Sequence, residues 1–145
     1  MLLIVEAISV GTINKTEVDE FKLSEKQLRK LELNMANLNL VMKHYDIDHR
    51  EIVMAQALLE TGHFQSKLCR QHGNLFGLYN SKRGKFYEFG HWSDSVRAYK
   101  QWIQRRYTKG DYYAFLKRIK YAEDPEYIPK LRNIVKRDNL KSKTT

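Results

Sequence analysis

The run Ala55–Gly62 constrains the fold more than any other stretch, because it sets one carboxylate, Glu60, in an almost wholly apolar segment. Apolar residues cover most of the circumference of the helix that this segment predicts, so we expect a central helix packed on several sides. Gly62 follows the expected end, where a helix commonly takes a left-handed backbone. Apolar surroundings raise the pKa of a carboxyl group, as a general acid working near neutral pH requires. Local physics leaves a second reading open, in which Glu60 is a surface residue in the last turn of an amphipathic helix.

The chain before this helix predicts one long amphipathic helix. Ser24 is a candidate N-cap, and apolar residues from Leu28 to Tyr45 recur at alternating spacings of three and four. The segment from Asp48 to Glu51 resembles a capping box and opens the helix that carries Glu60. Later helices are expected over residues 66–72, from Ser93 to about Tyr107, from Asp111, and after Asp124-Pro125, where Pro129 predicts a kink or a late start.

A small β-hairpin is expected in the middle of the chain. Two aromatic-rich runs, Leu78-Tyr79 and Phe86–Phe89, are joined by a polar segment that ends in Gly84. Short runs of this composition, separated by a polar turn with glycine, are typical of paired strands.

Length and composition indicate one ordered globular domain. The chain has 145 residues, with 2 prolines, 7 glycines and 42% apolar residues, which is enough to bury a single core. We expect an N-terminal arm over residues 1–23, a folded domain over 24–140 and a polar tail over 141–145. The polar segment from Asp138 to Thr145 is expected to fray.

The cysteine and histidine content indicates no metal centre. Cys69 is the single cysteine, which excludes an internal disulfide and a cysteine-rich metal site, and a buried hydrophobic role is favoured for it. The histidines lack the spacing of zinc ligands; they are His44, His49, His63, His72 and His91. We predict no metal and no cofactor.

The net charge of +9 is concentrated in the last third of the chain. Residues 97–145 hold 14 Lys or Arg against 5 Asp or Glu, whereas residues 1–96 hold 12 of each kind. Such a region attracts polyanions, and nucleic acid, an anionic membrane and an anionic cell wall all qualify. No run approaches the ~20 apolar residues of a membrane span. The opening Met1–Val5 lacks the basic flank of a secretory signal, which leaves the export route open.

Several motifs resemble those of one enzyme family. Gln56-Ala57-x-x-Glu60-Thr61-Gly62-x-x-x-Ser66, followed by Gly73-Asn74-Leu75-Phe76-Gly77, is similar to the signature of the glucosaminidase family of peptidoglycan hydrolases (glycoside hydrolase family 73), within the lysozyme-like superfamily. The similarity continues in Trp92-x-x-Ser95-Val96 and in Tyr121-Ala122-x-Asp124-Pro125-x-Tyr127 with Lys130-Leu131. The resemblance implies an α+β, mostly α, lysozyme-like helical domain with a small β-hairpin lobe flanking the active-site cleft.

The resemblance also implies catalytic roles. Glu60 takes the position of the general acid, which protonates the leaving oxygen of the β-1,4 bond between N-acetylglucosamine and N-acetylmuramic acid. The second catalytic group is left open. Glu88 on the hairpin is the nearest candidate carboxylate, whereas Asp94 is more simply a charge that favours the start of a helix. If neither acts, the substrate's own 2-acetamido group could take the role, with the Tyr121 hydroxyl hydrogen-bonded to its amide.

The candidate substrate-binding residues are Asn74, Phe76, Tyr79 and Tyr87. The short amide of Asn74 could fix its loop or bind a sugar, and the first role is favoured. Flat apolar rings stack on saccharides, and we expect Tyr79 and Tyr87 to form the walls of the cleft. Most of the other aromatic residues are expected in the core.

These features predict a monomeric peptidoglycan N-acetylglucosaminidase of the cell envelope or a secreted one. Its expected partners are the glycan strands of peptidoglycan and, through the basic last third, anionic wall polymers. The alternatives are a lytic transglycosylase, which leaves a 1,6-anhydro sugar, and a peptidoglycan-binding module without turnover. Specific nucleic-acid binding is not expected, because the basic region contains no recognised binding motif.

Overall fold

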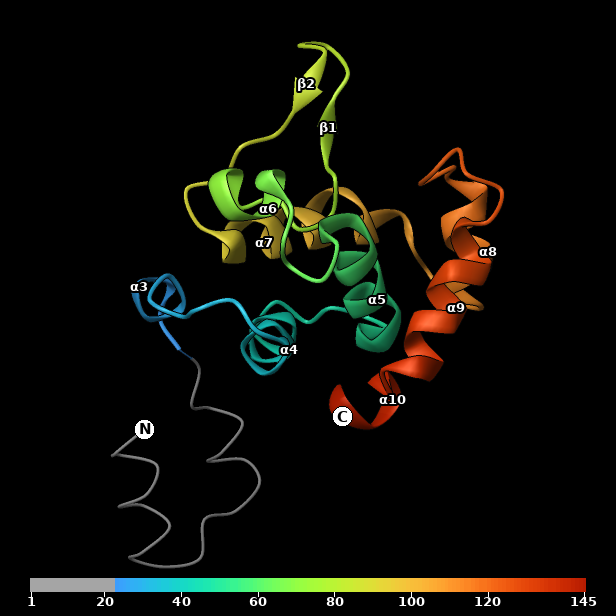
Figure 1. Ribbon diagram of the computed structural model, residues 1–145, viewed down its shortest axis with the longest axis horizontal. Helices are drawn as coiled ribbons and strands as arrows, with labels where there is room; N and C mark the ends of the chain where they lie inside the picture. The colour runs from blue at the N-terminus through green and yellow to red at the C-terminus, as the bar shows by residue number, and fades with distance from the viewer. Residues whose placement is uncertain (1–22) are drawn as a thin grey trace, which may run out of the picture.

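The computed structural model of the protein describes residues 23–145, so the arm predicted over residues 1–23 lies outside the described part except for Leu23. Within this part, helices surround α5 and a two-stranded antiparallel hairpin projects from one side (Figure 1). The elements are α3 (Glu25–Leu28), α4 (Met35–His44), α5 (Arg50–Thr61), α6 (Lys67–His72), β1 (Tyr79–Asn80), β2 (Lys85–Phe86), α7 (Trp92–Trp102), the 3-10 helix η1 (Gln104–Arg106), α8 (Tyr112–Arg118), α9 (Tyr127–Arg137) and α10 (Leu140–Lys143). The predicted fold class, α+β and mostly α with a small hairpin lobe, is confirmed.

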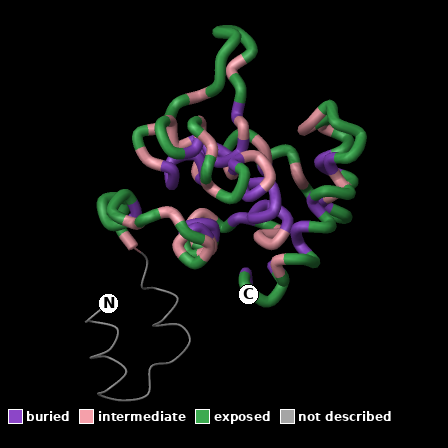
Figure 2. Tube along the Cα trace, viewed as in Figure 1, coloured by how far each residue is buried: buried purple, intermediate pink, exposed green. Residues whose placement is uncertain are grey.

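Helix α5 is the centre of the core. Every residue from Ile52 to Leu58 is buried (Figure 2), and α4, α9 and α10 pack against the helix. Gly62 ends α5 in the left-handed conformation, with φ of 54°, as predicted. The capping box predicted at Asp48 is wrong. Instead, the Asp48 backbone N–H and C=O are bound by the side chain of Gln104, at 3.0 and 2.8 Å, and α5 begins at Arg50 without a side-chain cap.

The long helix predicted from Ser24 to Tyr45 is two helices, α3 and α4. Ser24 caps α3 as predicted, in a capping box with Gln27. Asn34 then starts α4, because its side chain accepts a hydrogen bond from the Asn37 backbone at 2.8 Å. The apolar residues of both helices face the same core, so periodicity alone could not reveal the break.

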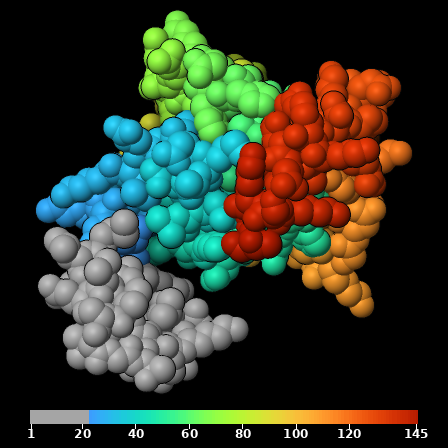
Figure 3. All heavy atoms as spheres, turned by 60° about the horizontal axis from the view of Figure 1, so that its bottom comes forward, coloured from blue at the N-terminus to red at the C-terminus, as the bar shows by residue number. Residues whose placement is uncertain are grey.

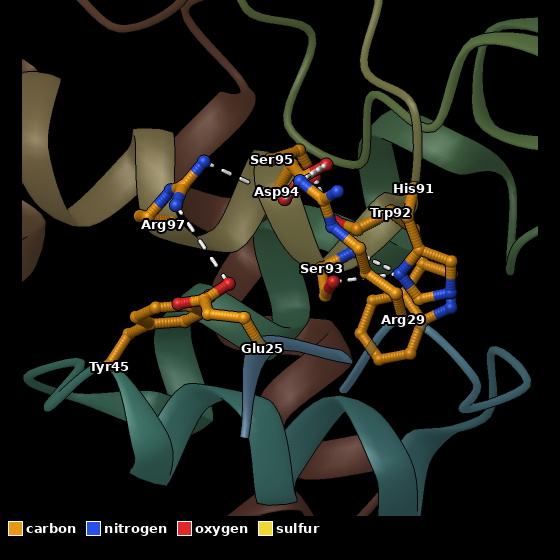
Figure 4. Close-up of polar contacts among 9 residues, drawn as sticks. All are labelled: Glu25, Arg29, Tyr45, His91, Trp92, Ser93, Asp94, Ser95 and Arg97. Atoms are coloured by element: carbon orange, nitrogen blue, oxygen red, sulfur yellow. Dashed lines mark hydrogen bonds and ion pairs between the residues drawn. The ribbon is translucent and has the colours of Figure 1, made fainter. Parts of the chain in front are cut away.

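Polar contacts hold α3 and the following loop against the first turn of α7 (Figure 4). Arg29 donates two hydrogen bonds to the Asp94 carboxylate, at 3.0 and 3.1 Å, and Arg97 lies 3.8 Å from it. The Trp92 indole donates to the Leu31 carbonyl at 3.0 Å. Asp94 is nearly buried within these contacts, so it serves as a structural ion-pair partner at the start of a helix.

Helix α7 is shorter than predicted, whereas α9 has the late start that was one of the two outcomes predicted from Pro129. Helix α7 ends at Trp102, and the single turn η1 replaces the rest of a helix predicted to reach Tyr107. Helix α9 begins late, at Tyr127, so Pro129 lies in its first turn. Backbone N–H groups have no intrahelical partner there, which removes the need for a kink at Pro129.

The end of the chain is folded, so the prediction of a frayed tail is wrong. Helix α10 buries Leu140 completely, and Thr144 is 5% exposed. The Arg50 guanidinium, at the start of α5, donates to the Thr144 carbonyl at 2.8 and 3.1 Å. The C-terminal segment, red in Figure 3, accordingly lies against the region of α4 and α5. The polar composition of this segment gave no indication that Leu140 would be buried or that the Thr144 carbonyl would accept hydrogen bonds from Arg50.

Cys69 lies in α6, the short helix expected in this region, which Ser66 and Gly73 cap at its two ends. The residue is 4% exposed, so its predicted hydrophobic role is confirmed. Burial raises the pKa of the Cys69 thiol, which disfavours the reactive thiolate.

Candidate active site

Glu60 is the penultimate residue of the central helix α5 and is itself half-buried. The adjacent Thr61 is fully buried and closes the helix end, since its hydroxyl donates to the Ala57 carbonyl at 2.6 Å and accepts from the Phe64 N–H at 2.8 Å. Burial raises the pKa of Glu60, and a hydrogen bond with the side chain of Tyr127 partly opposes this effect. The carboxyl group therefore retains its proton to a higher pH than an exposed glutamate would.

The turn that follows α6 is organised by Asn74, which is 1% exposed. Its Nδ2 donates to the carbonyls of Leu78 and Tyr87, at 2.9 and 3.0 Å. Its Oδ1 accepts from the backbone N–H groups of Phe76 and Leu78, at 3.3 and 3.0 Å. These four bonds use both donors and both lone pairs of the amide, so none is left for a sugar. The structure thus places Asn74 as the residue that fixes the turn, the role favoured from the sequence.

Gly77 brings the backbone of this turn against Glu60. Its φ is +63°, and a Cβ atom at this position would lie 2.9 Å from the Glu60 Oε2 atom. A side chain at this position would force the Glu60 carboxyl to shift, and the left-handed backbone independently favours glycine. The signature residues Glu60 and Gly77, distant in the sequence, thus form one wall of the site.

Tyr127, at the start of α9, is the site residue that the sequence analysis missed. Its hydroxyl accepts a hydrogen bond from the Gln56 side chain at 3.1 Å, and Tyr127 and Glu60 each affect the pKa of the other. Burial raises the pKa of Tyr127 well above its usual value, so the hydroxyl stays protonated. A signal was present, because Tyr127 closes the Tyr121–Tyr127 motif, but the interpretation selected the first tyrosine of that motif.

Tyr121 lies directly beside this site. Its hydroxyl donates to the Phe76 carbonyl at 2.6 Å, and its ring stacks on Tyr127 with centroids 5.8 Å apart. The donated proton is therefore engaged with the turn, while a lone pair on the hydroxyl oxygen remains able to accept a hydrogen bond. Phe76 itself is completely buried and packs against Tyr99, so its ring is placed in the core and not at a sugar-binding surface.

A groove of about 380 Å³ opens next to Gly77 and Tyr121, two of the residues around Glu60. Its walls carry aromatic and basic side chains, and it is lined by Gly77, Leu78, Tyr79, Tyr87, Trp102, Ile103, Arg106, Ile119, Lys120 and Tyr121. The two tyrosines expected to form cleft walls, Tyr79 and Tyr87, both line this groove, and Trp102 lines it with them. Its ring centroid lies 4.7 Å from that of Tyr87.

Glu88 follows Tyr87 on the segment after the hairpin. Its side chain is 63% exposed, and its Oε1 is 3.4 Å from the His72 Nδ1. Among the residues that the structure describes, the influences on the Glu60 pKa are burial and Tyr127, and no second carboxylate is one of them. The described residues also contain no group of three or more His, Cys, Asp or Glu side chains placed to hold a metal ion.

The geometry agrees with the comparison to known families. The family described as Glucosaminidase, mannosyl-glycoprotein endo-beta-N-acetylglucosaminidase, matches residues 35–140, a span that includes Glu60, Gly77, Tyr121 and Tyr127. No curated protein and no solved structure matches the chain. Because the family match covers most of the sequence and the fold is a lysozyme-like one, this chain belongs to the glucosaminidase family of glycoside hydrolases that act on peptidoglycan.

Proposed function

We propose that the protein hydrolyses the β-1,4 bond between N-acetylglucosamine and N-acetylmuramic acid in peptidoglycan, with Glu60 as the general acid. The observation that carries this proposal is the half-buried Glu60 carboxyl with its raised pKa, held at the end of a rigid helix beside an open aromatic groove. A general acid must hold a proton at the working pH and release it to the leaving oxygen. The raised pKa increases the protonated fraction of Glu60 near neutral pH, which supports this role.

The groove beside Glu60 is proposed as the path of the glycan strand. Tyr79 is 53% exposed and Phe86, which pairs with it edge-to-face, is 46% exposed. Exposed rings of this kind offer flat apolar surfaces to sugar rings. Arg106 and Lys120 lie on the same groove and would face the carboxylates of muramic acid and its peptides.

The second catalytic group is proposed to be the substrate's 2-acetamido group, with Glu88 as the alternative. The exposed side chain of Glu88, which lies beside His72, favours the first option. The free lone pair of the Tyr121 hydroxyl also favours it, because it can accept a hydrogen bond from the acetamido N–H. Assistance by the substrate retains the anomeric configuration, whereas a distant carboxylate acting through water inverts it. The anomer formed first, observed by NMR during hydrolysis, therefore decides between the two options.

The experiment that tests the proposal is digestion of purified peptidoglycan by the wild type and by Glu60→Gln, with the products resolved by mass. Reducing N-acetylglucosamine ends from the wild type alone are expected. Anhydro-muramic products would instead make the protein a lytic transglycosylase with the same acid. Equal activity of the two proteins would exclude Glu60 as the acid. Wall binding by both without any products would make the chain a binding module.

A wall-associated location follows from the proposed substrate, in the cell envelope or outside the cell. No helix among residues 23–145 is long and apolar enough to cross a membrane. We propose that the basic last third holds the enzyme near anionic wall polymers, although Lys130 and Arg137 are already paired with Asp124 and Asp138. Binding to purified wall material should weaken as salt is added, and binding that is insensitive to salt would contradict this role.

A further inference from the structure

A continuous chain of buried hydrogen bonds runs from η1 through the core to Tyr127, whose side chain acts on Glu60. We call its members the buried relay: in order, Gln104, Tyr112, Tyr99, Gln56 and Tyr127. All five residues are at most 7% exposed. The residues come from η1, α8, α7, α5 and α9, so the relay joins elements that are distant in the sequence.

The direction of every hydrogen bond in the relay is determined by its far end. The Gln104 Oε1 accepts from the Asp48 N–H at 3.0 Å, while its Nε2 donates to the Asp48 carbonyl at 2.8 Å, so this amide can have only one orientation. The same Nε2 donates to the Tyr112 hydroxyl at 3.0 Å. Because the Tyr112 hydroxyl accepts from Gln104, its own proton is directed to the Tyr99 hydroxyl, 2.8 Å away, and Tyr99 in turn donates to the Gln56 Oε1.

The same argument determines the last link. With its Oε1 accepting from Tyr99, the Gln56 amide must present its Nε2 to Tyr127, to which it donates at 3.1 Å. The Tyr127 hydroxyl has one proton, and that proton is left for the Glu60 carboxyl. A hydrogen bond to one Glu60 oxygen makes that oxygen less basic, so the acidic proton is favoured on the other oxygen.

We propose that the upstream members of the buried relay are positioning residues, which hold the Tyr127 hydroxyl as a permanent donor to Glu60 and thereby set the site and strength of its acidic proton. This inference rests on the proposed role of Glu60 as the general acid. It assigns a catalytic consequence to Tyr99 and Tyr112, which lie in the core and do not touch the carboxyl group.

The surroundings of Glu60 leave few other influences. The titratable groups that act on it or are affected by it are Tyr127 from α9 and Tyr121 from the preceding loop, whereas the nearby His63 is turned to Asp138, at 3.4 Å. Burial raises the pKa of Tyr112 to about 12 and that of Tyr99 further, so the relay hydroxyls keep their protons throughout the working range. The direction in which hydrogen bonds are donated along the relay is thus independent of pH.

The test is Tyr99→Phe, which removes one hydroxyl from the middle of the relay and retains the ring. Gln56 then loses the donor that orients its amide, and Tyr127 gains the Gln56 oxygen as a competing acceptor. Loss of a donor to the ionised form raises the pKa of a carboxyl group. We expect the alkaline limb of the kcat/KM–pH profile to move to higher pH, and the maximal rate to fall about 3- to 10-fold, as expected for one hydrogen bond. Tyr112→Phe, one link further away, should shift the limb in the same direction by less.

The matched control is Tyr107→Phe, which removes a neighbouring hydroxyl outside the relay. Tyr107 donates to the Gly110 carbonyl at 2.7 Å, and its ring packs on Tyr112. Both substitutions should lower the melting temperature modestly, but only Tyr99→Phe should move the pH profile. A profile that is unmoved in Tyr99→Phe, or moved equally in Tyr107→Phe, would overturn the proposal.

Two further measurements separate this inference from the proposed function. In Tyr127→Phe the limb should shift at least as far, and adding Tyr99→Phe should shift it no further, because the last link is already absent. The titration midpoint of the Glu60 carboxyl, followed by carbon NMR, should rise in Tyr99→Phe whether or not Glu60 is the acid. If Glu60→Gln kept its activity, the proposed function would fail while this midpoint still tested the relay.

Discussion

Two consecutive turns of this molecule are made from the same residue types and do different work. The turn over residues 74–78 and the hairpin over residues 79–86 each contain an asparagine and a glycine with positive φ. Asn74 makes four hydrogen bonds inside the protein, whereas the Asn80 side chain accepts one, from the Arg83 N–H at 3.2 Å on the surface. The difference shows that the residue types of a turn do not identify its function. The residues against which the turn packs identify it.

The largest effect expected from this contrast concerns the glutamate beside each turn. Glu60→Gln should lower kcat/KM on peptidoglycan by about 10²–10⁴-fold, because it removes the proposed proton donor and keeps the shape of the side chain. Glu88→Gln, on the exposed segment after the hairpin, should lower it by less than about tenfold, which is below the range of a general acid or base. Both variants are compared by the release of reducing ends. A loss in Glu88→Gln as large as in Glu60→Gln would make Glu88 the second catalytic group.

The two asparagines should differ in stability. Asn74→Ala leaves buried backbone groups unpaired, and we expect a loss of about 2–4 kcal/mol in the free energy of unfolding together with low activity. Asn80→Ala removes one exposed hydrogen bond and should change the free energy of unfolding by less than about 1 kcal/mol. Urea unfolding of both variants measures the difference. Similar values would mean that the buried turn tolerates rearrangement.

The two glycines test the contact with Glu60 at equal backbone strain. Alanine in a left-handed conformation costs about 1–2 kcal/mol, so Gly77→Ala and Gly84→Ala should both be destabilised by this amount. At Gly77 the new Cβ would also meet the Glu60 carboxyl, whereas at Gly84 the nearest atom is 4.0 Å away. Only Gly77→Ala should therefore lose more activity than its loss of stability explains. Activity retained in folded Gly77→Ala would show that the approach to Glu60 is dispensable.

The smallest expected effect is the pH dependence of stability. The pKa of Glu60 is raised in the folded protein above its ordinary 4.5, so its stabilising contribution is full below pH 4.5 and is lost as pH rises through the folded value. Glu60→Gln is neutral at every pH, so it should gain Tm relative to the wild type on going from pH 4 to pH 7, with ~2–4 °C for each kcal/mol. Glu88→Gln controls for the change in net charge. An equal gain in both variants would contradict a buried origin.

The sequence predicted the parts of this site that depend on local pattern. The apolar run before Glu60 and the glycine after it specified a buried helix with an acid at its end, and the polar segment between aromatic runs specified a hairpin. Both rest on short-range spacing, which one sequence displays directly. The capping preference of Ser24 could likewise be identified from its position.

The rest depended on tertiary contacts that no local pattern contains. Asn34 divides the predicted helix in two, because its side chain caps a new helix. The apolar stripe gives no sign of this break, since the same residues face the core on both sides of it. The donor to Glu60 comes from Tyr127, which lies far along the chain and on another helix. Gln104 carries no signal in the sequence, and its importance emerges only from its bonds to Asp48 and Tyr112. Long-range partners of this kind need coordinates.

The buried Cys69 has a practical consequence for studying the enzyme at work. It is the single cysteine in the sequence, and its thiol is enclosed with a raised pKa, so it should be silent toward maleimide reagents in the folded state. A cysteine introduced at the exposed Ser81, at the tip of the hairpin, would then be the sole site to take a fluorophore or spin label. The native chain thus offers an unlabelled background on which movement of the hairpin over a glycan strand can be recorded.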